Sequence, residues 1–136
     1  DITKRLSADE QLRLVEKYGI VLDAYERAAP LILHARTGAW FAREHFGVPD
    51  NIFSAIEWHT TGCPGMTTLD KIVYLADFIE PTRSFPGVER VRSLAFEDLD
   101  GAMIEALQMS IDNVRRRGFQ PHPRSEKTLR WLQTQN

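Results

Sequence analysis

Three residues on successive predicted helices have the right types to bind a metal ion together. His34 lies in the apolar stretch Leu31–Ala35, His59 closes the next predicted helix before a Gly/Pro turn, and Asp77 lies in the apolar stretch of the helix after that. Neutral imidazole and carboxylate groups suit Zn, Fe, Mn or Co, and helical metalloenzymes take ligands from separate helices. A carboxylate buried among apolar residues also costs free energy unless it is paired or bound to a metal. The pattern therefore favours a metal site.

Each of these residues also has a structural interpretation. Either histidine can bond a backbone carbonyl, and His59 can stabilise the negative end of a helix dipole. Asp77 can be the ion-pair partner of Lys71 or Arg83. The spacing of the three residues is less specific than that of two CxxC pairs, so the metal site is a hypothesis that rests on their co-occurrence.

A second set of residues has types that bind phosphate. Hydroxyl and backbone N–H groups of a turn can hold an anion, and arginine can bind phosphate bidentately. The set comprises Thr61, Gly62, Arg83, His122 and Arg124. Each can equally be a turn residue, a helix cap or a solvated charge, and Asp1 and Lys4 by themselves indicate only a charged chain end. The run Arg115–Arg117 reads as a solvated helix terminus.

Composition narrows the function class. The 136 residues are 43% hydrophobic and 26% charged, which is typical of one globular domain with its own core. A net charge of -2 gives no reason to expect nucleic acid or an anionic membrane as partner. No apolar run approaches the roughly 20 residues that span a bilayer. The single Cys63 excludes an intrachain disulfide and fits a reducing, cytoplasmic compartment.

Helical periodicity, caps and glycine terminators predict an all-α fold without strands. Capping motifs begin at Ser7, Asp23 and Thr67. The predicted helices cover about 7–19, 23–29, 31–46, 49–62, 67–81, 88–94 and 99–117, and a last one is capped by Ser125. Leu12, Ile52 and Ile72 are among the residues expected on the inward faces of these helices.

With these residues the chain resembles the YqeK branch of the HD-domain phosphohydrolases over almost all of its length. The matching stretches are Leu31–Ala39, His59–Met66, Leu69–Pro81, Arg83 with Phe85–Gly87, and His122–Arg124. The His-Thr-Thr-Gly and Leu-Ala-Asp-x-Ile-Glu-Pro stretches are specific to this branch among HD proteins. The resemblance implies an HD-domain helical bundle and the symmetrical hydrolysis of diadenosine tetraphosphate to two ADP.

The resemblance also implies roles for individual residues. Asp1, His34, His59 and Asp77 match metal ligands, and Asp1 would bridge two metals. Asp1 and Lys4 match catalytic positions. The residues implied in phosphate and nucleotide contacts are Lys4, Thr61, Gly62, Arg83, His122 and Arg124.

The implied cofactor is a divalent metal, with iron first and manganese or cobalt as substitutes. Such a metal lowers the pKa of water to roughly 7, which would prepare a hydroxide for attack on a phosphoanhydride. The implied partner is a small-molecule dinucleotide, with no membrane and no disulfide partner. Two alternatives are another HD-domain nucleotide phosphohydrolase and a metal-free HD-like interaction module.

The family pattern contains a histidine directly before Asp1 and an earlier helix with another histidine, and neither is in this sequence. We therefore expect residues 1–136 to form an HD domain without its N-terminal helices. Their absence should expose apolar faces around Leu33, Ile56 and Leu75, and a dimer or other association through that surface is expected.

Overall fold

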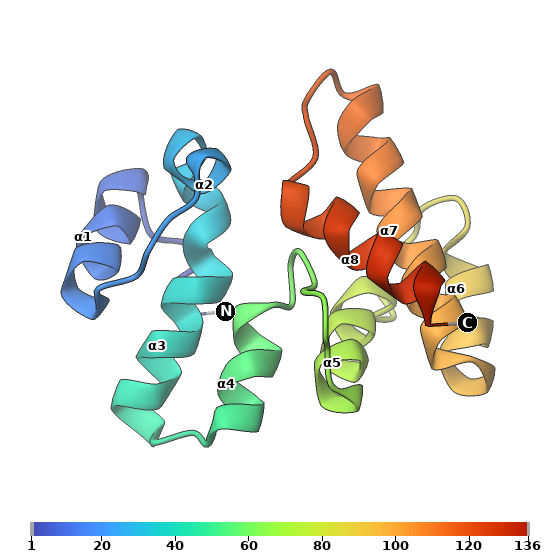
Figure 1. Ribbon diagram of the computed structural model, residues 1–136, viewed down its shortest axis with the longest axis horizontal. Helices are drawn as coiled ribbons and strands as arrows, with labels where there is room; N and C mark the ends of the chain where they lie inside the picture. Colours follow the sequence, from blue (N-terminus) through green and yellow to red (C-terminus); the bar gives the residue numbers. More distant parts are fainter. Residues whose placement is uncertain (1, 136) are drawn as a thin grey trace. The chain divides into compact units, whose positions relative to one another are not determined.

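The computed structural model describes residues 2–135, in which helices joined by turns and loops are present and no strand occurs (Figure 1). The all-α expectation is therefore confirmed for this part of the chain. The chain divides into two compact units, residues 1–60 and 61–136, and each is described by itself. No helix within the described residues is long and apolar enough to cross a membrane.

The first unit is built around the helical hairpin of α3 and α4. Its elements are α1 (Ala8–Tyr18), α2 (Ala24–Ala28), the 3-10 helix η1 (Pro30–Leu33), α3 (His34–Phe46) and α4 (Asp50–Glu57). Helix α3 contacts both α4 and α1. Gly47 ends α3 with a φ of 61°, a left-handed conformation that favours glycine. The tight connection that follows lets α4 return along α3.

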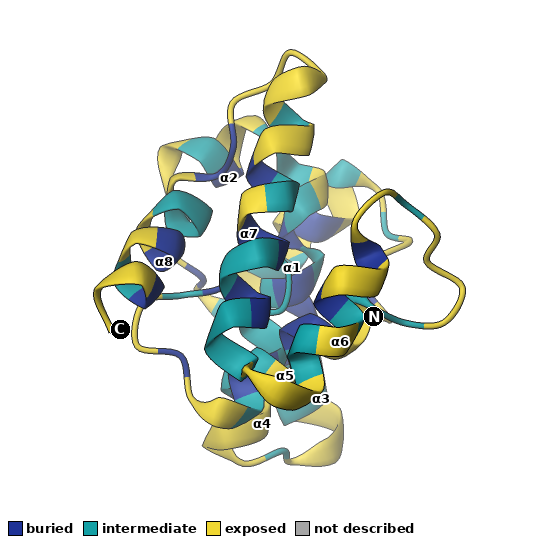
Figure 2. Cartoon of the chain, turned by 90° about the vertical axis from the view of Figure 1, so that its right-hand side faces the viewer, coloured by how far each residue is buried: buried dark blue, intermediate teal, exposed yellow. Residues whose placement is uncertain are grey.

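The second unit is built around α7. Its elements are α5 (Thr68–Phe78), α6 (Val88–Glu97), α7 (Leu99–Arg116) and α8 (Pro123–Thr134). Helix α7 contacts each of the other three. Met103, Leu107 and Ile111 recur along one face of α7 at helical spacing and are buried, as Figure 2 shows for that helix. This apolar face holds the unit together.

Local caps form where the sequence predicts them. Ser7, Asp23 and Thr67 each close a capping box with the carboxylate three residues later. Such caps depend only on neighbouring residues, because the side chain satisfies an N–H of its own first turn.

Several predicted helix ends differ in the structure. Helix α6 continues to Glu97 and not only to residue 94, and α5 ends at Phe78 before the predicted residue 81. Residues 30–33 form a 3-10 turn, so His34 begins α3. Helix α4 ends at Glu57 and not at Gly62, so His59 lies in the turn after it; the β-branched Thr60 and Thr61 favour helix only weakly. The last helix is capped by His122 and not by Ser125, because Pro123 fits its first position.

Some residues that the sequence predicts to face inward are exposed in the structure. Leu12, Ile52 and Ile72 are 39%, 40% and 48% exposed. In α1 the buried residue is instead Gln11, whose amide is hydrogen-bonded inside the first unit. Leu33 and Leu75, expected on exposed apolar faces, are themselves buried. The third such residue, Ile56, is partly buried.

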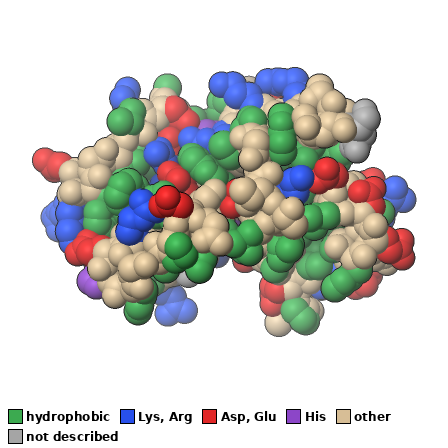
Figure 3. Space-filling view, turned by 60° about the horizontal axis from the view of Figure 1, so that its bottom comes forward, with side chains coloured by type: hydrophobic (Ala, Val, Ile, Leu, Met, Phe, Trp, Pro, Cys, Tyr) green, Lys and Arg blue, Asp and Glu red, His purple; other side chains and the backbone are tan. Residues whose placement is uncertain are grey.

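The surface carries charges of both signs. Figure 3 shows Lys and Arg side chains interspersed with Asp and Glu side chains on the face in view. This mixture agrees with the net charge of -2.

Alanine substitutions can test whether Leu107 of α7 is a core residue and Ile72 of α5 a solvent-facing one. We expect Leu107→Ala to lower the free energy of unfolding by about 2–5 kcal/mol, because it opens a cavity in the core of the second unit. Ile72→Ala should change it by less than about 1 kcal/mol, because Ile72 is half exposed. Urea denaturation followed by circular dichroism measures both. Equal losses would contradict the assignment of Ile72 to the solvent face.

Candidate active site

The first unit brings His34 and His59 side by side. His34 begins α3 and His59 follows the end of α4, so the hairpin of these two helices returns one residue to the other. The ring centroids lie 5.6 Å apart, with an angle of 67° between the ring planes. Two of the four predicted ligands thus come from one helical hairpin.

Both rings are oriented by backbone carbonyls. Nδ1 of His59 lies 2.6 Å from the carbonyl oxygen of Ile56, and Nδ1 of His34 lies 3.3 Å from that of Leu31. A carbonyl acceptor selects the tautomer with the proton on Nδ1, and the lone pair that can bind a metal is then on Nε2. Metal-binding histidines commonly have their second nitrogen held in this way. The pair therefore fits a divalent metal.

The surroundings of His34 favour its neutral form. Burial lowers the pKa of His34 below its ordinary value, and the nearby His59 and Lys4 lower this pKa further through their positive charge. A metal competes with protons for imidazole, so a lowered pKa favours metal binding at neutral pH.

Asp77 belongs to the second unit and is not buried, which corrects the expectation from its apolar stretch. Its side chain is 50% exposed and lies 3.6 Å from the Arg83 guanidinium. It follows the buried Leu75 by two residues, about 200° around the helix, so it faces away from that part of the core. The ion-pair alternative is confirmed with Arg83, whereas Lys71 pairs with Asp100 at 2.6 Å.

Arg83 lies in the segment that follows α5, where two carboxylates hold its guanidinium. Besides Asp77, its guanidinium lies 3.8 Å from Glu80. Both contacts are long and half exposed, so they orient the side chain while leaving it accessible. A guanidinium in this position can bind an anion bidentately.

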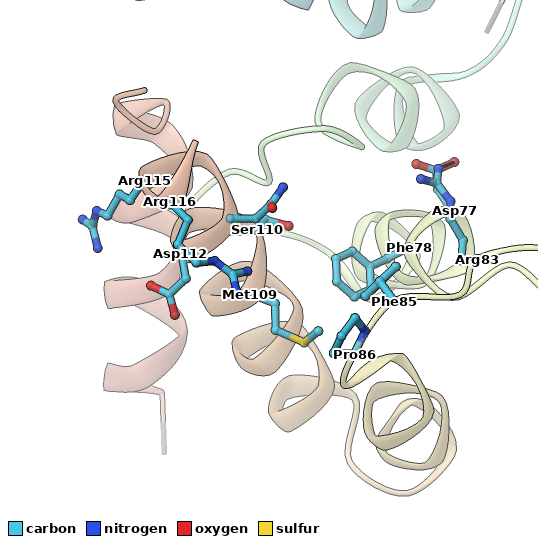
Figure 4. A pocket seen from close by; sticks show the side chains of 11 residues that line it. Asp77, Phe78, Arg83, Phe85, Pro86, Met109, Ser110, Asp112, Arg115 and Arg116 are labelled. Atoms are coloured by element: carbon cyan, nitrogen blue, oxygen red, sulfur yellow. Dashed lines mark ion pairs between the residues drawn. The ribbon is translucent and has the colours of Figure 1, made fainter. Parts of the chain in front are cut away.

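A pocket of about 930 Å³ opens beside Asp77 and Arg83 in the second unit (Figure 4). Its walls come from the end of α5, the segment 83–86 and the C-terminal half of α7. The Phe78 and Phe85 rings meet edge to face with centroids 5.1 Å apart. Arg115 and Arg116, predicted as a solvated terminus, also line this pocket. The sequence did not single out Phe78, Phe85 or Met109, although Phe85 follows Arg83 in a matching stretch.

The remaining phosphate-binding candidates meet at the start of α8. The Arg124 guanidinium donates to the Thr61 hydroxyl over 3.5 Å, and the Arg124 backbone N–H donates to Nδ1 of His122 over 2.9 Å. Gly62 has a φ of 69°, and a Cβ there would lie 2.9 Å from a methyl group of Thr128. Thr61 and His122 are buried, so Arg124 is the most accessible side chain of this group. His122 has a defined structural role as the cap of α8.

Asp1, predicted as both a ligand and a catalytic residue, lies outside the described residues. Lys4 is described and has an exposed side chain in the turn before α1. The structure thus groups the described candidates into His34, His59 and Lys4 in the first unit, and two clusters in the second.

The lowering of the pKa of His34 by the positive charge of Lys4 can be tested by titration. We expect the imidazole of His34 to titrate below 6.5, and Lys4→Met to raise its pKa only part of the way, because burial is the larger cause. The folded form then binds fewer protons than the unfolded form near pH 6, so this group destabilises the fold as the pH falls. NMR of the histidine ring protons measures the pKa. Arg5→Met is the matched control, and an equal shift in both variants would contradict a specific effect of Lys4.

Comparison with known proteins gives close relatives. No family model matches the sequence. A protein named bis(5'-nucleosyl)-tetraphosphatase, symmetrical, from Halalkalibacterium halodurans is 52% identical over 81 residues, which are 59% of this chain and 43% of that protein. The protein of the same name from Bacillus subtilis is 41% identical over 104 residues, which are 76% of this chain and 56% of that protein. The chain spans about half the length of these curated relatives.

A solved structure shares the fold. It is described as a predicted HD superfamily hydrolase involved in NAD metabolism, from Clostridium acetobutylicum, and matches with a TM-score of 0.95 at 31% identity. The match covers 100% of this chain and 72% of that chain. The expected HD-domain fold is confirmed. The chain therefore belongs to the HD superfamily of hydrolases.

Proposed function

We propose that this chain carries the active site of a metal-dependent hydrolase that cleaves diadenosine tetraphosphate symmetrically into two ADP. The observation that carries the proposal is the His34–His59 pair, in which each Nδ1 lies beside a backbone carbonyl. The relatives named symmetrical tetraphosphatases support the substrate and the position of the cut.

In this proposal His34, His59 and Asp77 are metal ligands, together with Asp1, which lies outside the described residues. Iron is the proposed metal, with manganese or cobalt as substitutes. A divalent metal, when bound, supplies an activated water and polarises a phosphoryl group. The protein keeps His34 neutral through burial and sets both ring orientations through the carbonyls of Leu31 and Ile56.

Three cations of the chain are proposed to act at the phosphates. Negative charge spreads over the phosphoryl oxygens as the anhydride bond breaks, so fixed positive charge nearby lowers the barrier. Lys4 supplies such a charge close to His34, and Arg83 supplies a planar guanidinium oriented by Asp77 and Glu80. Arg124, with Thr61 and Gly62, is proposed as a further phosphate contact, and His122 orients Arg124 by capping α8.

The substrate class follows from the same groups. A dinucleoside polyphosphate offers phosphates to the cations and purine rings to apolar surfaces. The pocket beside Arg83 has both arginine and phenylalanine walls, which suits part of such a ligand. Another nucleotide substrate is the alternative, because the solved relative is described as involved in NAD metabolism. A cytoplasmic location is proposed from the single cysteine, and dimerisation stays a prediction.

Product analysis tests the reaction. Incubation of the protein with diadenosine tetraphosphate and Mn²⁺ or Fe²⁺ should give ADP as the only nucleotide product. ATP plus AMP would mean that another phosphorus is attacked. Absence of turnover with metal bound would indicate another phosphorylated substrate, and absence of metal binding would favour the interaction module.

Substitution of the histidines tests the ligand assignment. His59→Ala should abolish both Mn²⁺ binding, measured by calorimetry, and turnover, because it removes one imidazole of the pair. His45→Ala is the matched control, since His45 is exposed near the end of α3 and should leave both unchanged. Turnover that survives His59→Ala would show that the metal assignment is wrong.

The role of Arg83 is tested separately. Arg83→Ala should lower kcat/KM about 100-fold, in the range found when one fixed donor to a transition state is removed. Arg83→Lys should recover only part of the loss, because an ammonium cannot bind phosphate bidentately. Arg90→Ala, an exposed arginine of α6 paired with Glu105, is the control. A loss of similar size in Arg90→Ala would argue against a specific role.

A further inference from the structure

A buried polar network lies beside the His34–His59 pair and is not used by the proposed chemistry. Its side chains are Thr3, Gln11 and Thr37, which are 2%, 0% and 0% exposed. Polar groups at such depth cost free energy unless they are hydrogen-bonded. Apolar side chains of similar size would fill this space without that cost, so the network calls for an explanation beyond packing.

The hydrogen bonds of the network join three segments of the first unit. The Thr3 hydroxyl donates to the backbone carbonyl of His34 over 2.9 Å. The Gln11 amide nitrogen donates to the carbonyl of Thr3 over 2.6 Å, and the Thr37 hydroxyl donates to the Gln11 amide oxygen over 2.7 Å. Each donor proton, from the two hydroxyls and the Gln11 amide, takes part in one bond, so the three hydrogen bonds can exist together.

The segment with Thr3 approaches α3 closely. A Cβ on Gly38 would lie 3.3 Å from the Thr3 hydroxyl oxygen, which is tighter than ordinary contact. Gly38 lies one turn after His34 on α3. The absence of a side chain there lets the turn at residues 2–5 pack directly against the first turns of the helix.

The network therefore ends on two residues of the candidate site. Thr3 directly precedes Lys4 in the chain and directly bonds the backbone of His34. Helix α3 has no side-chain cap at its first turn, since Leu33 occupies the cap position. The bond from Thr3 to the His34 carbonyl attaches the turn at residues 2–5 to the start of α3.

We propose that Gln11, with Thr3 and Thr37, is a positioning network that sets the placement of His34 and Lys4 relative to each other. The inference rests on the proposed function, because it takes His34 to be a metal ligand. Gln11 is central to it, since its amide donates to one segment and accepts from another, which neither an ionised carboxylate nor an apolar side chain does. Loss of the network should loosen the start of α3 and weaken metal binding even where the chain stays folded.

Paired substitutions at Thr37 test this role. Thr37→Val keeps the volume but removes the hydroxyl, and should raise the Kd for Mn²⁺ about tenfold, the lower range for outer partners of metal ligands. Thr37→Ser keeps the hydroxyl and should restore most of the affinity. Calorimetry with Mn²⁺ measures the Kd, and circular dichroism establishes that each variant is folded. Amide NMR should show shifts at Lys4 and His34 in the valine variant but not in the serine variant.

A matched control separates positioning from general stability. Phe53→Leu removes packing against Trp40, whose ring centroid lies 5.1 Å from that of Phe53, and it leaves the polar network intact. Its Kd for Mn²⁺ should stay within about twofold of the original. Equal weakening in Phe53→Leu and Thr37→Val, or an unchanged Kd in Thr37→Val, would overturn the proposal.

Gln11→Met provides a second variant if Thr37→Val does not fold, since it replaces the amide by an apolar chain of similar length. It should weaken Mn²⁺ binding as Thr37→Val does, and an unchanged Kd would overturn the proposal. If neither variant folds, the network is required for folding itself and the positioning role is overturned. Failure of the unsubstituted chain to bind Mn²⁺ would instead remove the proposed function, and the inference with it.

Discussion

The contact between α3 and α4 brings His34 and His59 together, and the chemistry proposed for this chain depends on that contact. Neither histidine is adjacent to the other in sequence, and each is placed by a helix end: His34 begins α3 and His59 follows α4. The carbonyls of Leu31 and Ile56, each three residues before its histidine, then orient the rings. A histidine and the carbonyl three residues earlier belong to the same turn, so the orientation of each ring is a local property. The proximity of the two rings is a tertiary one.

Buried polar side chains of the first unit hold this arrangement through hydrogen bonds. Gln11 and Thr37 occupy buried positions where an apolar side chain would have no desolvation cost of polar groups. Their hydrogen-bond network ends on Thr3 and on the backbone of His34. A fully satisfied buried network restricts the alternatives open to the segments that it joins. The turn with Lys4 is thereby attached to α3, although few apolar side chains of that turn are buried.

The second unit uses a different arrangement. Helix α7 buries an apolar face against its three neighbours, and the polar candidates lie outside that core. Asp77 and Arg83 pair on the exposed side of α5, and Arg124 reaches Thr61 from the first turn of α8. The half-exposed Asp77–Arg83 pair contributes little to stability. It holds the Arg83 guanidinium in an accessible position, as the proposed phosphate site requires.

The sequence by itself determined the helical class, the capping boxes at Ser7, Asp23 and Thr67, and the glycine ends at Gly19 and Gly47, because each depends on neighbouring residues. Its motifs also pointed to the superfamily that the solved relative confirms. Only the tertiary structure decided which face of each helix is buried. Gln11 was overlooked and Leu12 misplaced because a pattern of apolar residues assumes an apolar interior, whereas this one is partly polar. Asp77 was expected to be buried, since its neighbours in sequence are apolar, but in a helix exposure follows direction around the axis and the position of the packing partner.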